Sequence, residues 1–361
     1  MQRKQILYLL AIVALLVSLL PTAALAQEGV TTSDAPTSQT CTQLSAAEQQ
    51  EFDALTALKA AETLAGADLA RHDALAQQLD CYSARLVAPV QDAQPKGATR
   101  QAPTVTKTVG TSGADYATLK LAFDDINNGT LTGSVQLDVI DNTTETDPAV
   151  LNASGSGSAS YTAVLIQPSG GAARTISGAI AAGSPLIDLN GADNVTIDGL
   201  NSGGNSLTIA NTTVAATSGT STIRFQTDAT NNTVTNASIL GSSTMATTTN
   251  GGTIWFGAAS TTTGNDNNVI SNSNIGPAGS NLPTKAIYGN GTTTTATLYN
   301  SGNQIVGNNI YDYFNAAAQA NAVYLGAGNT GWTINNNRIY QTATRTQTTG
   351  AILAGIQAAS S

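Results

Sequence analysis

One pattern of apolar and polar positions occurs four times in the C-terminal half of the chain. An aliphatic residue is followed by an asparagine-rich stretch and, five positions on, by isoleucine. The first anchors lie 36, 35 and 29 residues apart, and internal periods of this size predict one supersecondary unit stacked on its copies. The copies span 234–239, 270–275, 305–310 and 334–339.

The five-residue spacing predicts a bend inside each copy. Along an uninterrupted strand, residues five apart face opposite ways, yet both anchors are apolar. Asn and Gly tolerate the left-handed backbone best, and one of them stands two positions after each first anchor: Asn236, Asn272, Gly307 and Asn336. β-prone runs precede the copies, at 222–225, 253–256, 286–288 and 322–325. Each repeat is therefore predicted to be strand, loop, strand, corner, strand, which is one coil of a parallel β-helix.

An earlier, less regular coil is predicted at 185–200, where the second anchor, Leu200, follows Ile197 by three positions. Further upstream, residues 105–109 alternate as a strand. Residues 115–126 then place Tyr116, Leu119, Phe123 and Ile126 on one helical face. This segment predicts a helix that caps the open end of the solenoid.

These residues resemble the right-handed parallel β-helix repeat of the pectate-lyase-like superfamily, and more closely the large secreted bacterial surface β-helix proteins, whose activities are mostly unassigned. The likeness covers residues 104–361 and rests on the motifs at 115–119 with Phe123, 194–199 and 332–346. It implies an all-β solenoid, a right-handed parallel β-helix with an N-terminal capping helix. It supplies no catalytic motif that can be transferred.

The N-terminus predicts a signal peptide at 1–26, with basic Arg3 and Lys4, an apolar core at 6–20 and a small-residue cleavage site at 24–26. A membrane anchor, the alternative, needs about 20 apolar residues. The mature chain is thus expected to be secreted or at the cell surface of a bacterial-type exporter, with no span after signal cleavage. Residues 27–44 are predicted to be a flexible segment.

Residues 45–86 predict a small α-helical hairpin, because apolar residues recur at helical spacing after a capping box at 45–48. Cys41 and Cys81 bracket it, and in an exported chain they predict a disulfide. One straight helix would hold them roughly 60 Å apart, so pairing requires a turn near 66–68. The module is either a spacer or a partner-binding segment. A proline-containing linker follows at 87–103.

Charge limits the possible partners. The chain has 14 basic and 23 acidic residues and a net charge of −9, which argues against nucleic acid or anionic lipid. Carbohydrate or a cell-envelope surface remains as a partner, and neither a cofactor nor a metal site is predicted. From residue 104 onward there are 13 acidic residues, 7 basic residues and no histidine. The single His72 is expected on a solvated helix face.

The best acidic group is Asp188, Asp193 and Asp198, spread over about one coil. Carboxylates in such positions could form a glycosidase pair or a calcium site, but Asx-type turns at Asp193 and Asp198 are the favoured interpretation. Residues 264–268 resemble a calcium loop without its closing Glu, so a loop tip is predicted.

A second candidate site is a stripe formed by the residue after the apolar anchor in successive coils: Arg224, Trp255, Tyr288 and Tyr324. Facing outward, it would suit sugar stacking or a partner surface. The alternative is that loops cover it.

Two functions follow. The sparse titratable chemistry favours a non-catalytic extracellular scaffold or adhesin-like surface protein, possessing no enzyme activity, that displays loops or a lateral surface to glycan or envelope. The alternative is a polysaccharide lyase or glycoside hydrolase of the β-helix type. Residues 351–356 read as a new strand with no cap after it, so we also expect the chain to be the N-terminal part of a longer protein.

Overall fold

The computed structural model describes residues 51, 55, 67–69, 71, 72, 74, 75, 105–246, 248–348 and 350–359. The chain divides into two units, Met1–Arg85 and Leu86–Ser361. In the first, every described residue is helical, and Arg71 pairs with Glu51 at 2.9 Å between Nη2 and Oε2. The predicted signal peptide, the linker, Cys41 and Cys81 lie outside the described residues. None of the described helices has the length and hydropathy needed to span a bilayer.

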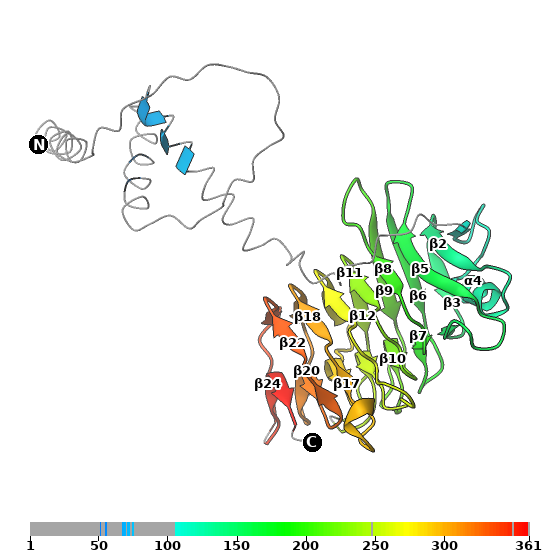
Figure 1. The fold of residues 1–361 in the computed structure, drawn as a ribbon. Helices are drawn as coiled ribbons and strands as arrows, with labels where there is room; N and C mark the ends of the chain where they lie inside the picture. The colour runs from blue at the N-terminus through cyan, green and yellow to red at the C-terminus, as the bar shows by residue number, and fades with distance from the viewer. Residues whose placement is uncertain are drawn as a thin grey trace, which may run out of the picture. The chain divides into compact units, whose positions relative to one another are not determined.

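The second unit is a parallel β-helix, as predicted (Figure 1). Its strands form three long sheets, in which each strand pairs in parallel with the equivalent strand of the next coil. Sheet A contains β1 (Val105–Val109), β2 (Gly133–Val139), β5 (Tyr161–Pro168), β8 (Val195–Asp198), β11 (Thr233–Thr235), β14 (Val269–Ser271), β18 (Gln304–Val306) and β22 (Thr333–Asn335).

The other two sheets complete each coil. Sheet B contains β3 (Thr143–Glu145), β6 (Ala173–Gly178), β9 (Ser206–Asn211), β12 (Ser238–Gly241), β15 (Asn274–Pro277), β19 (Asn309–Tyr311) and β23 (Arg338–Tyr340). Sheet C contains β4 (Ala149–Asn152), β7 (Pro185–Asn190), β10 (Ser221–Gln226), β13 (Gly252–Phe256), β16 (Lys285–Gly289), β20 (Ala320–Leu325) and β24 (Leu353–Ala358). A short pair, β17 (Asn300–Ser301) and β21 (Asn329–Thr330), and the 3₁₀ turn η2 (Ala296–Leu298) lie in the loops.

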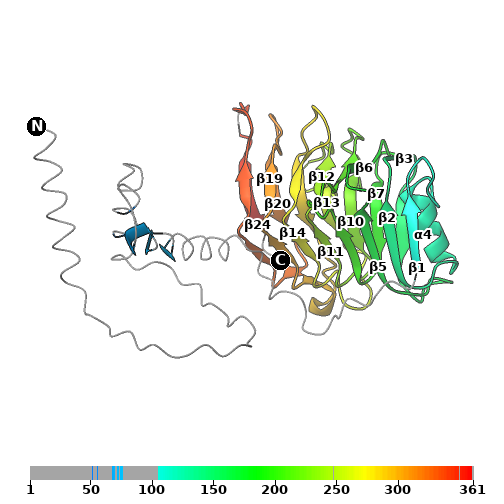
Figure 2. The ribbon, with the colours of Figure 1, turned by 90° about the horizontal axis from the view of Figure 1, so that it is seen from above.

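A helix covers the N-terminal end of the solenoid (Figure 2). It is α4 (Leu119–Asn127), which buries Leu119, Ala122, Phe123 and Ile126. The capping helix is therefore confirmed, but it begins later than predicted. Thr118 is its N-cap, and Asp115 instead accepts a hydrogen bond from the Thr108 amide at 2.8 Å.

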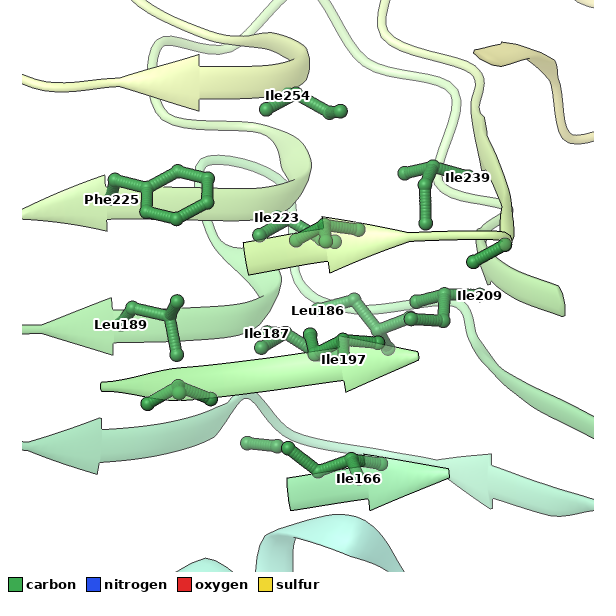
Figure 3. Close-up of a cluster of buried hydrophobic side chains, with 14 of the residues drawn as sticks. Ile166, Leu186, Ile187, Leu189, Ile197, Ile209, Ile223, Phe225, Ile239 and Ile254 are labelled. Carbon is green, nitrogen blue, oxygen red and sulfur yellow. The ribbon is translucent and has the colours of Figure 1, made fainter. Parts of the chain in front are cut away.

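The core is a stack of mainly aliphatic side chains contributed by strands of all three sheets. Figure 3 shows Ile197, Ile209 and Ile223 converging from sheets A, B and C, and all three are at most 1% exposed. Burying each such side chain contributes about 1.5–3 kcal/mol to the free energy of unfolding. A thin core of this kind suits a chain in which only 10% of residues are charged, because every coil repeats it.

The predicted corners are observed. Asn236, Asn272, Gly307 and Asn336 have φ angles of 54°, 49°, 69° and 54°, all in the left-handed region. The prediction for the earlier coil was wrong. Its second anchor is Ile209, which pairs with Ile239 in register, whereas Leu200 begins an inserted loop with φ 61°.

Buried asparagine ladders join the coils at their turns. In one ladder, Oδ1 of Asn268 accepts hydrogen bonds from the backbone N and from Nδ2 of Asn232, at 3.1 and 2.9 Å. Asn268 makes the equivalent donations to Oδ1 of Asn303, at 2.9 and 3.1 Å. All three asparagines are fully buried. The ladders therefore satisfy backbone groups that no strand pairing reaches.

Candidate functional site

The outer face of sheet C carries one column of side chains, with one member from each coil. Backbone register places these residues opposite one another in sequence: Val150, Asp188, Arg224, Trp255, Tyr288, Tyr324 and Gln357. The slot proposed for the stripe is thus observed. Side chains alternate along a strand, so the residue after each inward anchor faces outward.

The middle of this column is covered. Trp255 is 7% and Tyr288 3% exposed, whereas the Arg224 side chain is 18% exposed and Tyr324 is half-buried. The loop between β12 and β13 (loop 242–251, of which residues 242–246 and 248–251 are described) borders this region: Asn250 Oδ1 accepts a hydrogen bond from Asn290 Nδ2 at 3.1 Å. The centre of the stripe is therefore buried rather than exposed.

Asp188 and Arg224 form a bidentate ion pair across two coils. Arg224 Nε lies 2.8 Å from Asp188 Oδ1 and Nη2 2.6 Å from Oδ2. The Asp188 side chain is 4% exposed, and the guanidinium carbon is 5.4 Å from the Trp255 ring centroid. Such a buried pair holds its partners in place and would be strongly destabilised by the loss of either.

The Lys285 amine packs against the aromatic ring of Tyr288 in the same region. Lys285 Nζ lies 3.8 Å from the Tyr288 ring centroid, and it donates hydrogen bonds to the carbonyl oxygens of Ala246, at 3.2 Å, and of Thr249. Lys285 is 0% exposed. Its amine is therefore enclosed between strand β16 and the loop 242–251.

Burial shifts the pKa of Lys285 and the pKa of Tyr288 in opposite directions. It lowers the pKa of Lys285 to about 7, because the charged ammonium loses its hydration. Burial, reinforced by the neighbouring Tyr324 hydroxyl, raises the pKa of Tyr288 to about 12. Around pH 7 part of the Lys285 amine is therefore neutral and able to accept a proton, and it lies against the ring of the protonated Tyr288. Such opposite shifts are typical of acid–base pairs in active sites.

One further polar atom of this column is buried without a hydrogen-bond partner among the described residues. Among the described residues, none accepts a hydrogen bond from Trp255 Nε1, although the atom is buried. Trp255 lies one coil from Tyr288 in the same column. A buried indole N–H normally finds an acceptor, so this donor is available to a bound group.

The predicted acidic group does not form a site. Asp193 accepts hydrogen bonds from the backbone N and from Oγ1 of Thr230 in the next coil, both at 2.7 Å. Asp198 accepts from the Leu200 amide at 2.9 Å, which is the predicted Asx-type turn, and from Asn236 Nδ2 at 3.0 Å. The described part of the chain contains no group of three His, Cys, Asp or Glu residues placed to hold a metal.

Two smaller expectations were wrong. Residues 264–268 are not a loop tip, since Asn265 and Asn268 are 0% exposed ladder residues and Asp266 Oδ1 accepts from the Ser301 amide at 2.7 Å. His72 is helical, but it is 7% exposed rather than solvated.

Sequence reasoning missed Lys285. It is the only lysine after Lys120, and it stands at the first position of a β-prone run in which every neighbour is apolar or neutral. A lone lysine in such a run was the available signal. Its enclosure depends on the loop 242–251, which has no periodic pattern.

Comparison with known proteins gives a structural likeness. No family model and no curated protein matches the chain. A solved structure, the alginate lyase from Paenibacillus sp. str. FPU-7, is similar with 12% identity and a TM-score of 0.25, over 66% of this chain and 98% of that one. At this level the likeness concerns the fold alone.

The predicted non-catalytic scaffold or adhesin is corrected by this comparison. The similar solved structure is described as an alginate lyase, an enzyme of the class named in the alternative prediction and not a non-catalytic surface protein. The scaffold prediction relied on the small number of titratable residues in the repeats, and it left Lys285 out of account.

Proposed function

We propose that this protein is a polysaccharide lyase that cleaves an acidic polysaccharide by β-elimination at the outer face of sheet C. The observation that carries the proposal is the enclosed contact between Lys285 Nζ and Tyr288, 3.8 Å from the ring centroid. It lies in a column that also presents Arg224 and Tyr324, one on either side.

The available side chains favour elimination over hydrolysis. Glycoside hydrolysis commonly uses two carboxyl groups flanking the bond that is cut. The seven strands of sheet C carry one carboxylate, Asp188, and both of its oxygens are bound by Arg224. Elimination instead needs a base, an acid and donors for a carboxylate, and these groups are present.

The proposed reaction requires a uronic acid, because its carboxyl group acidifies the proton on the adjacent carbon. The neutral amine of Lys285 removes that proton, a double bond forms to the neighbouring carbon, and the bond from that carbon to the glycosidic oxygen breaks. The Tyr288 hydroxyl protonates the departing oxygen. A proton then passes from the Lys285 ammonium to the Tyr288 phenolate, which restores both groups.

Neighbouring groups would bind the substrate carboxylates. Trp255 Nε1, the buried donor without a described partner, lies one coil from Tyr288 and serves the reacting sugar. Arg224 lies two coils from Tyr288, or about 10 Å, and serves the next sugar along the chain. Its Nη1 remains available because Nε and Nη2 bind Asp188.

Substrate entry requires the loop 242–251 to move, because its carbonyl oxygens bind Lys285 Nζ. The charged ammonium holds this loop through charge-assisted hydrogen bonds. Deprotonation produces the base, and opening of the loop then admits the polymer; such loop steps often limit turnover.

The test is an assay on sodium alginate, polygalacturonate and hyaluronan, with neutral dextran as the control polymer. Elimination gives a product whose conjugated double bond absorbs ultraviolet light, along with new reducing ends. Lys285→Met and Tyr288→Phe should each lower the initial rate about 10²-fold or more. Lys120→Met and Tyr161→Phe are matched controls, since they remove a surface lysine of α4 and a buried tyrosine hydroxyl of sheet A.

The two signals separate the outcomes. Ultraviolet product lost in the Lys285 and Tyr288 variants but kept in the controls supports the proposal. Reducing ends without ultraviolet absorbance would identify a hydrolase and contradict it. Absence of both signals with all three acidic polymers would also reject it.

A further inference from the structure

The outer face of sheet B carries a pair of tyrosines that the proposed reaction does not use. Tyr311 and Tyr340 are opposite one another on β19 and β23. Their ring centroids are 5.7 Å apart, with 21° between the ring planes, and both side chains are half-buried. They form a small aromatic surface away from the column on sheet C.

The preceding coil makes room for this surface. Gly276 occupies the position before Tyr311 in the same sheet, and a Cβ atom there would lie 2.5 Å from Tyr311 Cζ. The Tyr311 ring therefore lies across the backbone of Gly276. A larger residue at this position would displace the ring.

A cation stands beside the rings. Arg338 is exposed, and its guanidinium carbon lies 4.5 Å from the Tyr340 ring centroid. In the described part of the chain no carboxylate pairs with Arg338, whereas Arg224 and Arg345 each pair with an aspartate. An uncompensated cation on a chain of net charge −9 points to an anionic ligand.

An amide column continues the polar side of this face. Arg338 is in register with Asn309, whose Nδ2 donates to Asn274 Oδ1 at 3.0 Å. Polar side chains of successive coils thus run parallel to the tyrosines. Aromatic faces beside amide and guanidinium donors suit a sugar ring, which has an apolar face and a polar edge.

We propose that the outer face of sheet B binds an acidic polysaccharide, with sugar rings against Tyr311 and Tyr340 and a uronate carboxylate on Arg338. Coils repeat about every 4.8 Å, close to the length of one sugar residue in an extended chain, so one sugar meets each coil. The class of ligand rests on the proposed function. Tyr311, Tyr340 and Arg338 include no lysine, histidine or carboxylate to remove the proton, so this surface holds the polymer near the enzyme without cutting it.

The test is affinity electrophoresis of the full chain on ice, in gels that contain sodium alginate or polygalacturonate. The native protein should be retarded, and Arg338→Gln should weaken the apparent affinity about tenfold. Gly276→Ala should also weaken it, because the added Cβ moves Tyr311 while leaving every donor in place. Arg174→Gln, on sheet B at β6, is the matched control for loss of a positive charge and should keep the native affinity. Thermal unfolding of each variant checks that the fold is retained.

The outcomes distinguish this surface from the catalytic site. Retardation lost in Arg338→Gln and kept in Lys285→Met supports the proposal. If the native protein is retarded and yields no elimination product, this surface stands and the proposed function fails. If Arg338→Gln and Gly276→Ala are retarded as strongly as the native protein, or if neither polymer retards the native protein, the proposal is overturned.

Discussion

Tyr288 and Tyr324 stand in register on β16 and β20, with ring centroids 5.5 Å apart and ring planes only 4° from parallel. The stack places a half-buried phenol next to a buried one. Burial raises the pKa of Tyr288 to about 12, and the Tyr324 hydroxyl adds to the shift. Tyr288 is therefore protonated throughout the neutral range, as a general acid must be.

Tyr288 should make the fold sensitive to alkali. Its folded pKa lies above the unfolded value of 10.0, so its contribution to stability is complete below pH 10 and is lost as the pH rises through about 12. Urea unfolding followed by circular dichroism should show a shallower loss of stability over this window in Tyr288→Phe than in the native protein. Identical slopes for the two proteins would contradict the assigned shift.

Lys285 predicts a rise of activity with pH. The folded chain releases the lysine proton near pH 7, whereas the unfolded chain holds it to about 10.5. The elimination rate should therefore increase through pH 7 as the amine is freed. The free energy of unfolding should increase over the same range, since the unfolded state binds more protons there.

The stability arm of this prediction needs no substrate. Lys285→Met should abolish the increase in unfolding free energy between pH 7 and pH 10, while Lys120→Met, the control at a half-buried surface lysine, should keep it. An equal pH dependence in all three proteins would show that Lys285 does not titrate in this range.

The corners and the buried ladders show how far sequence reasoning reached. Asn236 could be predicted to bend the chain, because its conformation follows from local backbone preference and the spacing of its anchors. Asn268 has the same side chain, but its role depends on Asn232 and Asn303 in other coils. Composition alone cannot separate a left-handed corner from a buried ladder.

The site was predictable to the same limited extent. The sequence pattern placed Trp255 and Tyr288 in equivalent positions of successive coils, and the structure pairs them in register. Their burial depends on the loop 242–251, whose path is fixed by contacts such as that of Lys285 Nζ with the Ala246 carbonyl. Insertions have no period, so the same limit explains why Ile209 was missed as the anchor that follows Ile197.

The ladder predicts a large cost for a small substitution. Asn268→Ala would leave the Asn232 amide and the Ala229 carbonyl without the partners they now have. Each buried unsatisfied group costs about 1–3 kcal/mol, so the free energy of unfolding should fall by about 3 kcal/mol or more. Asn205→Ala is the control, because Asn205 accepts one hydrogen bond in an exposed setting, from the Gly171 amide. Equal losses in urea unfolding for the two variants would argue against the ladder as a stabilising element.

The stability of the loop 261–264 should depend on pH in the acid range, through the ionisation of Asp228. Its carboxylate accepts hydrogen bonds from four consecutive amides, Thr261 to Gly264, at 3.0–3.2 Å. Burial opposes ionisation, but these bonds outweigh it, and the pKa lies below its ordinary value of 3.8. The stabilisation is therefore present above pH 3.8 and is lost as the pH falls through the folded pKa.

The matching variant is Asp228→Asn, which keeps the shape but turns an NH₂ group toward backbone donors. At neutral pH it should lower the free energy of unfolding by about 2 kcal/mol, and the difference from the native protein should shrink as the pH falls below 3.8. Asp147→Asn, at an exposed turn, should change little at either pH. A deficit in Asp228→Asn that is unchanged in acid would mean that packing, not the ionised carboxylate, orders the loop.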